Sequence, residues 1–328
     1  MKKRRAFPLV LTAIVVAYFL GPAPDAPDLE NLKLGSVPSD LMQIESWIRE
    51  KNSAFKIKPD NGSYMKWANE DSIYQTEYTL LYLHGFSASP GEGLPMHEDI
   101  AKEYGMNLYV PRLFQHGLIE DEPMLGFTGE GWMTSAKEAI EVAKTLGEKV
   151  VIMSCSTGGT ASLFLSAEND PAIAAQICYS PNVDLYDSKS FLLTKPWGLQ
   201  IGRKVLGGEY YTWDVPEGAE KYWHGKYRLE SLIQLKAMID ESMTKETFEK
   251  INVPTFIAYY YKNEEEQDDV VAISATKEMI KELGVAKEDL DVVVLPSVGA
   301  HAMQSHFFSK DLEGLKKETR EFLDGILK

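Results

Sequence analysis

A short serine-rich turn holds the residues of this chain most suited to nucleophilic chemistry. Residues 150–152 are apolar and predict a buried strand, and the small residues of 153–159 follow directly. The spacing Ser154-x-Ser156-x-Gly158 is a variant of Gly-x-Ser-x-Gly, a strand-to-helix turn that lifts its central serine oxygen above the sheet. Ser154 replaces the usual first glycine. The pattern predicts Ser156 as a nucleophile, against the alternative of a Ser/Gly-rich loop without chemistry.

Partners for such a serine follow further along the chain. A nucleophilic serine needs a base within hydrogen-bond reach and a carboxylate that orients this base. The strand-like residues 254–261 lead into the acidic segment 264–269, and the strand-like residues 291–295 lead towards His301. The order serine, acid, histidine is the one expected for this type of turn. His301 is therefore the predicted base, and the acid is expected from the acidic segment.

A third segment, His84-Gly85-Phe86, is predicted to stabilise the negative charge that forms during acyl transfer. The strand-like residues 78–83 end in His84-Gly85-Phe86. Acyl transfer builds charge on a carbonyl oxygen, and two preorganised N–H groups can bind this oxyanion. We expect these groups to be the backbone N–H of Phe86 and that of Thr157, the residue after the nucleophile. His84 itself is expected to have a structural role.

From about residue 76 to residue 328 the chain resembles the α/β-hydrolase superfamily, and within it the carboxylesterase and monoacylglycerol-lipase-like branch. The segments that carry the resemblance are the serine turn, His84-Gly85-Phe86, Pro111-Arg112-Leu113-Phe114-Gln115-His116-Gly117, Ser180-Pro181-Asn182 and Gly299-Ala300-His301. The resemblance implies an α/β fold with a mostly parallel, eight-stranded sheet flanked by helices. It also implies a helical cap inserted at about residues 183–250.

The resemblance assigns roles to three side chains. It makes Ser156 the nucleophile and His301 the base. It favours Asp268 as the acid, because the family often places the acid shortly before a Val-Val pair. Asp269 is the close second and Asp184 a more distant alternative.

The remaining acidic and histidine side chains are less suited to catalysis. The run 264–266 is expected to be a solvated face, as blocks of like charge usually are. His306 is a weaker base candidate, because residues 303–310 are expected to form a helix. His97, His116 and His224 are expected to be structural or exposed.

The expected activity is that of a serine carboxylic-ester hydrolase, esterase- or lipase-like, which works through an acyl-enzyme and needs no cofactor. The expected partner is a small ester or a lipid-like substrate. The same three residues would also serve an acyltransferase, an amidase or a peptidase. A non-catalytic ligand-binding protein on the same fold is a rival from another class, and labelling of Ser156 separates it from the enzymes.

The length, net charge and cysteine and histidine content of the chain limit the kinds of partner and ligand that it can bind. The chain has 328 residues, enough for one α/β domain with an insertion, and a formal net charge of −15, which argues against nucleic acid as a partner. Six scattered histidines and two cysteines do not form a metal-ligand set. Cys155 and Cys178 are expected to be two small buried residues, although a bridge between neighbouring strands stays open.

The N-terminus has the pattern of a targeting segment. Four basic residues at positions 2–5 precede the apolar run 6–20, which is typical of a signal peptide. As a helix the run would reach about 22 Å, less than the ~30 Å hydrocarbon core, which favours a signal peptide. Gly21-Pro22-Ala23 is a poor cleavage site, which favours an uncleaved membrane anchor.

We therefore divide the chain into residues 1–28, a leader with its tether, and residues 29–328, the hydrolase domain. The positive-inside rule predicts an extracytoplasmic domain, periplasmic or secreted, either free or anchored through residues 6–20.

Apolar periodicity predicts the elements that position these residues. The expected helices are 41–50, 97–104, 132–146, 160–167, 272–283 and 312–327, and residues 63–68 are expected to open the sheet as an antiparallel edge strand. Aromatic residues are dense in the insertion, where they would either line a substrate pocket or pack the cap.

Overall fold

The computed structural model describes residue 12 and residues 15–327. Seven strands form one sheet in the order β1-β3-β2-β4-β5-β8-β9. They are β1 (Tyr64–Lys66), β2 (Thr76–Leu83), β3 (Asn107–Val110), β4 (Gly147–Cys155), β5 (Ile173–Tyr179), β8 (Thr255–Tyr259) and β9 (Leu290–Val294). All neighbouring pairs are parallel except β1 with β3. The predicted α/β architecture and antiparallel edge strand are confirmed, but within the described residues the sheet has seven strands and not eight.

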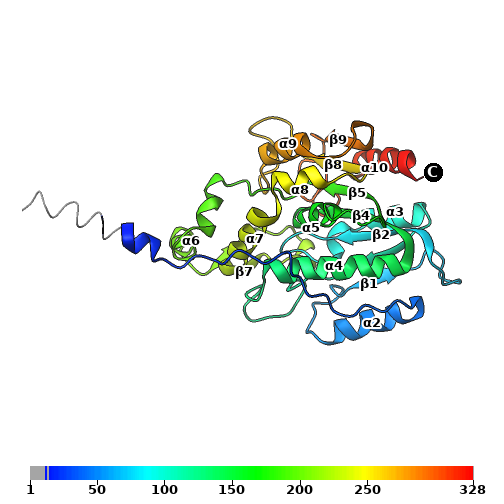
Figure 1. Ribbon diagram of the computed structural model, residues 1–328, viewed down its shortest axis with the longest axis horizontal. Coiled ribbons are helices and arrows are strands. Elements are labelled where there is room, and N and C mark those ends of the chain that lie inside the picture. Colours follow the sequence, from blue (N-terminus) through cyan, green and yellow to red (C-terminus); the bar gives the residue numbers. More distant parts are fainter. Residues whose placement is uncertain (1–11, 13–14, 328) are drawn as a thin grey trace, which may run out of the picture.

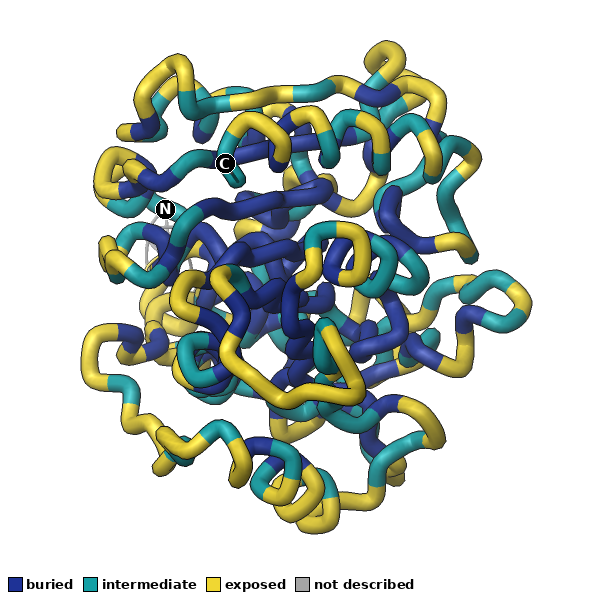
Figure 2. Tube along the Cα trace, turned by 90° about the vertical axis from the view of Figure 1, so that its right-hand side faces the viewer, coloured by how far each residue is buried: buried dark blue, intermediate teal, exposed yellow. Residues whose placement is uncertain are grey.

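Apolar side chains point to both faces of the central strands, so the sheet has two apolar faces. Leu81 of β2 and Ile152 of β4 belong to the core on one face, while Tyr82 and Met153 belong to the core on the other. Successive side chains of a strand point to opposite faces, so both faces need helices over them. In Figure 2 the buried strands run through the centre between exposed outer segments.

Helices cover both faces, as the apolar periodicity predicted. They are α2 (Leu41–Ser53), α3 (Met96–Glu103), α4 (Gly129–Leu146), α5 (Thr157–Ser166), α9 (Ile273–Glu282) and α10 (Leu312–Ile326). Helices α2, α4, α5 and α9 contribute to one apolar core, and α3 and α10 contribute to the other (Figure 1). The six helices expected at 41–50, 97–104, 132–146, 160–167, 272–283 and 312–327 are all present, with boundaries that differ by three residues or fewer.

One expected helix is wrong. Residues 303–310 form turns and not a helix. Within this segment, the rings of Phe307 and Phe308 pack against Trp223, and their centroids lie 6.1 and 5.1 Å from the Trp223 ring. Packing against the insertion thus determines the local conformation, which the apolar pattern alone does not encode.

The insertion between β5 and β8 contains helices and a small hairpin. Its elements are η2 (Ser188–Thr194), α6 (Gly198–Leu206), β6 (Tyr210–Thr212), η3 (Ala219–Lys221), β7 (Lys226–Arg228), α7 (Leu229–Ser242) and α8 (Lys245–Lys250). Strands β6 and β7 pair antiparallel, apart from the main sheet. Helices α6 and α7 lie beside the body of the domain, on the side from which the N-terminal segment arrives (Figure 1).

The described part of the N-terminal segment contacts this insertion. Residues 15–19 are helical. Trp197 donates from Nε1 to the Ala17 carbonyl at 3.0 Å and from its backbone N–H to the Pro22 carbonyl at 2.8 Å. The expected targeting segment falls largely on residues 1–11 and 13–14, which lie outside the described residues. Among the helices that the structure describes, none combines the length and apolarity needed to cross a membrane.

Candidate active site

Ser156 lies on a strained turn between β4 and α5. Its backbone has φ 53° and ψ −121°, a conformation that costs a non-glycine residue free energy and persists only when its surroundings enforce it. Two hydrogen bonds from the β5 side do so. Ser156 N–H donates to the Tyr179 carbonyl at 3.0 Å, and Asn182 N–H donates to the Ser156 carbonyl at 3.0 Å. The end of β5 therefore holds the predicted nucleophile in position.

Close backbone contact explains the small residues of the turn. A Cβ atom at Gly158 would lie 2.0 Å from the carbonyl oxygen of Leu83 at the end of β2. Ser154, at the position of the usual first glycine, instead turns its hydroxyl to the Ile177 carbonyl of β5 at 3.1 Å. The glycine is therefore essential on the β2 side, and a serine is accommodated on the β5 side.

The topology places the oxyanion loop beside this turn. Strands β2 and β4 are neighbours, yet the chain continues from β2 to β3 on one side and from β4 to β5 on the other. Such a switch point opens a crevice at the carboxyl ends of the strands. A Cβ built on Gly85 would lie 3.0 Å from the Ser156 Cβ. Segments about seventy residues apart in sequence thus meet at the predicted nucleophile.

His84 orients the peptide that carries the predicted oxyanion donor. Its Nε2 accepts from Leu113 N–H at 3.0 Å, so Nδ1 carries the proton and donates to the Gly85 carbonyl at 2.9 Å. Burial lowers the pKa of His84 to about 3, which keeps the ring neutral. The Gly85 carbonyl and the Phe86 N–H belong to the same peptide group. His84 thus has a structural role, as expected. It holds the peptide group whose N–H, that of Phe86, is the predicted oxyanion donor.

Aromatic packing fixes the side chain of Phe86. Its ring meets those of Phe127, His116 and Tyr227 edge to face, with centroids 5.1, 5.4 and 5.4 Å away. Such contacts add to burial in restricting the loop. Neither the Phe86 nor the Thr157 backbone N–H donates a hydrogen bond to any described residue. Both N–H groups are therefore available for an oxyanion.

Asp268 and His301 form a close pair. His301 Nδ1 lies 2.6 Å from Asp268 Oδ2. The other carboxylate oxygen of Asp268 accepts from Val270 N–H at 2.9 Å and Val271 N–H at 3.1 Å. Asp268 is buried, whereas Asp269 is exposed. The structure thus brings Asp268 and not Asp269 to the histidine, and the following Val-Val pair supplies two of its donors.

Electrostatics support the ionised form of this aspartate. Burial on its own raises the pKa of Asp268, but His301 and the two backbone donors outweigh it and hold the pKa below its usual range. For His301, burial lowers the pKa, and the Asp268 carboxylate outweighs this and raises it above 6.5. Each partner therefore favours the charged form of the other.

The second ring nitrogen of His301 is unpaired. Its Nε2 is buried and has no hydrogen-bond partner among the described residues, so no hydrogen bond joins it to Ser156 in this conformation. Hydrogen bonds between a base and its nucleophile are often long without substrate and shorten in the reacting complex. The unpaired Nε2 leaves the site able to accept one proton.

Sequence reasoning missed one buried acid at this site. Glu92 is 2% exposed and lies in the short helix η1 (Pro90–Gly93) directly after the oxyanion loop. Its Oε2 accepts from the Tyr82 hydroxyl at 2.8 Å and from Gly85 N–H at 2.9 Å. Burial raises the pKa of Glu92 to about 7. A lone glutamate in a Pro-Gly-rich stretch carries no sequence signal for this position.

The other candidate acids and bases lie in different environments. Asp184 pairs with Lys236 at 3.2 Å, and residues 264–266 are exposed as expected. His306 is exposed and bonds the Leu94 carbonyl at 2.8 Å. Cys155 and Cys178 are free, buried thiols. The described chain contains no cluster of three side chains suited to a metal ion.

The aromatic residues of the insertion divide into three groups. Tyr227 packs edge to face against Phe86, and Tyr211 packs against Tyr227, with ring centroids 5.4 Å apart in each pair. Trp213, Tyr222 and Trp223 pack against Phe307 and Phe308 beyond His301. Tyr186, Phe191 and Trp197 have exposed rings. The first group contacts Phe86 of the oxyanion loop, and the second packs against Ala88 of the same loop, so packing of the cap against the domain is observed for both groups.

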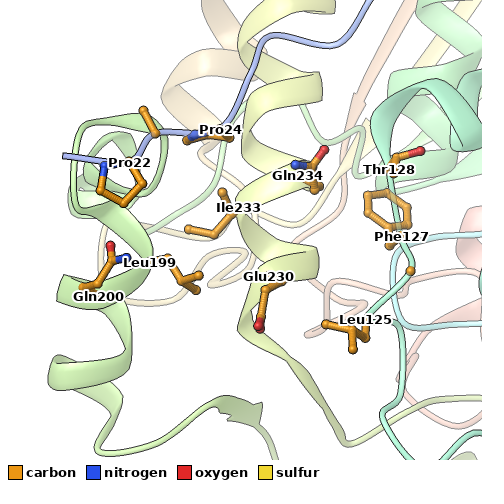
Figure 3. A pocket seen from close by; sticks show the side chains of 12 residues that line it. Pro22, Pro24, Leu125, Phe127, Thr128, Leu199, Gln200, Glu230, Ile233 and Gln234 are labelled. Carbon is orange, nitrogen blue, oxygen red and sulfur yellow. The ribbon is translucent and has the colours of Figure 1, made fainter. Parts of the chain in front are cut away.

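A separate apolar cavity of about 390 Å³ lies between the tether, α6, α7 and the loop after Leu125. Figure 3 shows Pro22 and Pro24 on one side, Ile233 of α7 in the middle and Phe127 on the other side. None of the three predicted catalytic residues lines it. Phe127 is a shared wall, because its ring also contacts Phe86. The cavity therefore lies behind the oxyanion loop.

No protein-family model and no curated protein matches the sequence. Solved structures do match. A structure described for the metagenome-derived lipolytic enzymes LipS and LipT has a TM-score of 0.66 at 14% identity, over 82% of this chain and 99% of that chain.

Two further structures agree. A monoacylglycerol lipase of Paleococcus ferrophilus has a TM-score of 0.59 at 14% identity, over 80% of this chain and 97% of that chain. Est1E of Butyrivibrio proteoclasticus, with ferulic acid bound, has a TM-score of 0.54 at 19% identity, over 81% and 96%. The chain therefore has the α/β-hydrolase fold. This is the fold that the resemblance found in the sequence implies.

The contact between Gly158 and β2 generates a prediction. We expect Gly158→Ala to lower the free energy of unfolding by about 3 kcal/mol, because the new methyl group must displace the backbone of Leu83. Urea unfolding followed by circular dichroism measures this. Gly208→Ala is the matched control, since a Cβ at Gly208 meets nothing within 4 Å. Equal stability of both variants would contradict the close contact.

Proposed function

We propose that this protein is a serine hydrolase that cleaves carboxylic esters through an acyl-enzyme. The observation that carries the proposal is the 2.6 Å pair of Asp268 and His301, whose Nε2 has no partner among the described residues, together with the strained turn that bears Ser156. The fold supports it, because the structural neighbours include lipolytic enzymes and a monoacylglycerol lipase.

In the proposed reaction, Ser156 Oγ attacks the ester carbonyl carbon while His301 Nε2 takes its proton. The carbonyl oxygen becomes an oxyanion, which the N–H groups of Phe86 and Thr157 stabilise. His301 then donates its proton to the leaving alcohol as the C–O bond breaks. Water, activated by His301, attacks the acyl-enzyme and releases the acid and the free serine. Asp268 orients the ring and stabilises the imidazolium.

The proposed substrate class is a small ester with an apolar or aromatic group. Tyr227 and Tyr211 next to Phe86 offer ring surfaces close to the oxyanion donors. Est1E, a neighbour in fold, binds ferulic acid, an aromatic acid. Acyl transfer to an alcohol, amide cleavage and ligand binding without catalysis are alternatives on the same scaffold, and labelling of Ser156 separates ligand binding from the enzymes.

The role of Ser156 can be tested directly. We expect the full-length protein to hydrolyse p-nitrophenyl esters and to react with a fluorophosphonate probe, and we expect Ser156→Ala to lose both by about 10³-fold or more. Ester hydrolysis is followed by absorbance and labelling by mass spectrometry. Ser154→Ala is the control that keeps the nucleophile. An unlabelled Ser156 in a folded protein would favour the ligand-binding alternative.

The choice between the two neighbouring aspartates gives a second test. We expect Asp268→Asn to lower kcat/KM by about 10³-fold, because the asparagine loses the charge that stabilises the imidazolium. Asp269→Asn makes the same chemical change at an exposed position one residue away, and we expect it to stay within about threefold of the wild type. If Asp269→Asn loses more activity than Asp268→Asn, the catalytic acid is Asp269 and the assignment to Asp268 is wrong.

We further propose that the N-terminal segment anchors the domain on the extracytoplasmic side of a membrane. Phe19 and Leu20 are 73% and 77% exposed, and apolar side chains of this kind gain free energy on entering a lipid phase. The basic residues 2–5 favour the cytoplasmic end of such a segment.

Fractionation tests the anchor. We expect the full-length protein to stay in the membrane pellet of a bacterial host after alkaline carbonate extraction, and a chain without residues 2–20 to be released. Protease added to intact spheroplasts should digest the anchored domain. Recovery of the full-length protein in the cytosol, protected from protease, would refute both the anchor and its orientation.

A further inference from the structure

One buried carboxylate joins three segments of the site. Glu92 accepts from Gly85 N–H of the oxyanion loop and from the Tyr82 hydroxyl of β2. The same hydroxyl accepts from Gln304 Nε2 at 3.0 Å. Gln304 follows His301 by three residues. Glu92 is thus linked by hydrogen bonds to both the oxyanion loop and the segment that carries the base.

We propose that Glu92 is a positioning residue of this site: its carboxylate fixes Gly85 of the oxyanion loop and, when ionised, favours the imidazolium form of His301. This inference rests on the proposed function for its catalytic meaning, and it deepens that function by adding a second carboxylate to the machinery.

The positioning role follows from the two hydrogen bonds at Gly85. Glu92 holds the N–H of Gly85 at 2.9 Å, and His84 Nδ1 holds its carbonyl at 2.9 Å. The peptide groups on both sides of Gly85 are therefore fixed, and the second of them carries the Phe86 N–H. A glycine has few intrinsic conformational restraints. The two side chains supply the restraint that the oxyanion donor needs.

The position of Glu92 also brings a charge to the reacting centre. The ideal Gly85 Cβ position lies 2.8 Å from Glu92 Oε1 and 3.0 Å from the Ser156 Cβ, so the carboxylate and the nucleophile flank the same glycine. Glu92 and His301 interact electrostatically, each favouring the charged form of the other. Two carboxylates, Asp268 and Glu92, thus act on one imidazole.

The ionisable groups around this pair come from several elements. Glu92 faces Tyr82 of β2, His301 beyond β9 and Cys155 at the end of β4. The cap approaches through Tyr222, whose ring lies against Gly91. His301 also faces Asp268 and Asp269 from the loop after β8. Tyrosine and thiol groups stay neutral at neutral pH, so the charges that matter are those of the carboxylates and the histidine.

The pKa values of both coupled groups are raised above their ordinary values. Burial raises the pKa of Glu92 to about 7, and the carboxylates raise that of His301 above 6.5. Removing the Glu92 charge takes away an anion that favours imidazolium, so the pKa of His301 must fall. A base with a lower pKa stays neutral, and therefore competent, at lower pH.

The first experiment measures the histidine itself. Full-length protein with ¹⁵N-labelled histidine is titrated by NMR, and the His301 signals are assigned with His301→Gln. We expect Glu92→Gln, which keeps an acceptor for Gly85 N–H, to lower the pKa of His301 by about one unit. Glu313→Gln removes an exposed carboxylate on α10 and is the matched control. An unchanged His301 pKa in folded Glu92→Gln would overturn the proposed charge coupling.

Tyr82→Phe gives a second, milder variant. It removes the hydroxyl donor, so the ionised form of Glu92 loses a hydrogen bond and the carboxylate protonates more readily. We expect the pKa of His301 to fall in this variant too, by less than in Glu92→Gln. If Glu92→Gln does not fold, the comparison of Tyr82→Phe with the wild type tests the charge coupling instead. A His301 pKa equal to that of the wild type would then contradict the proposal.

The pH dependence of activity supplies the catalytic readout. In the wild type, two coupled groups titrate on the acid limb of kcat/KM, which should spread over two ionisations. In Glu92→Gln a single ionisation should remain, displaced by about one unit to lower pH. A variant that lowers kcat at every pH equally would point to a purely structural glutamate.

The two hypotheses fail in distinguishable ways. If the wild type hydrolyses no ester but the pKa of His301 still falls in Glu92→Gln, the proposed function is wrong and the coupling stands. If the wild type is an active esterase and neither the NMR pKa nor the acid limb moves, the function stands and the role of Glu92 is wrong.

Discussion

The contact between the backbone of Gly158 and the end of β2 is the constraint on which the rest of the site depends. It brings α5 so close to β2 that only a glycine fits, because an added Cβ would lie 2.0 Å from the Leu83 carbonyl oxygen. The same proximity places the loop after β2 against the strained Ser156 turn. Parallel pairing of β4 with both neighbours then fixes the three strand ends relative to one another. Nucleophile and oxyanion donors thus derive their geometry from the sheet register.

A second level of organisation is electrostatic. Asp268 and Glu92 are buried and His301 is partly buried, and burial opposes the charged form of each of them. Asp268 overcomes this with two backbone donors and the imidazole, whereas Glu92 has one backbone donor and one hydroxyl. Their pKa values therefore move in opposite directions, although both side chains are carboxylates. The difference in donors, and not the residue type, separates a permanent anion from a group that titrates near neutrality.

Much of this architecture could be predicted from the sequence, and the failures have physical causes. Helices with an apolar periodicity and strands with apolar runs were predicted well, because both depend on local pattern. The turns in 303–310 were missed because tertiary contacts of Phe307 and Phe308 with Trp223 outweigh the local preference. The eighth strand was expected from the resemblance alone. Glu92 was missed because its burial and its interaction with the distant His301 depend on the tertiary fold, although its partners Tyr82 and Gly85 are near in sequence.

The aromatic contacts of the insertion give the base a second support besides Asp268. The segment after His301 is packed against Trp223 through Phe307 and Phe308, and it is hydrogen-bonded to Tyr82 through Gln304. One end of this segment is therefore tied to the cap and the other to the oxyanion loop network. Packing at interior density leaves little room for one of these groups to shift alone. The cap, the segment after His301 and the end of β2 thus form one packed and hydrogen-bonded region around the predicted base.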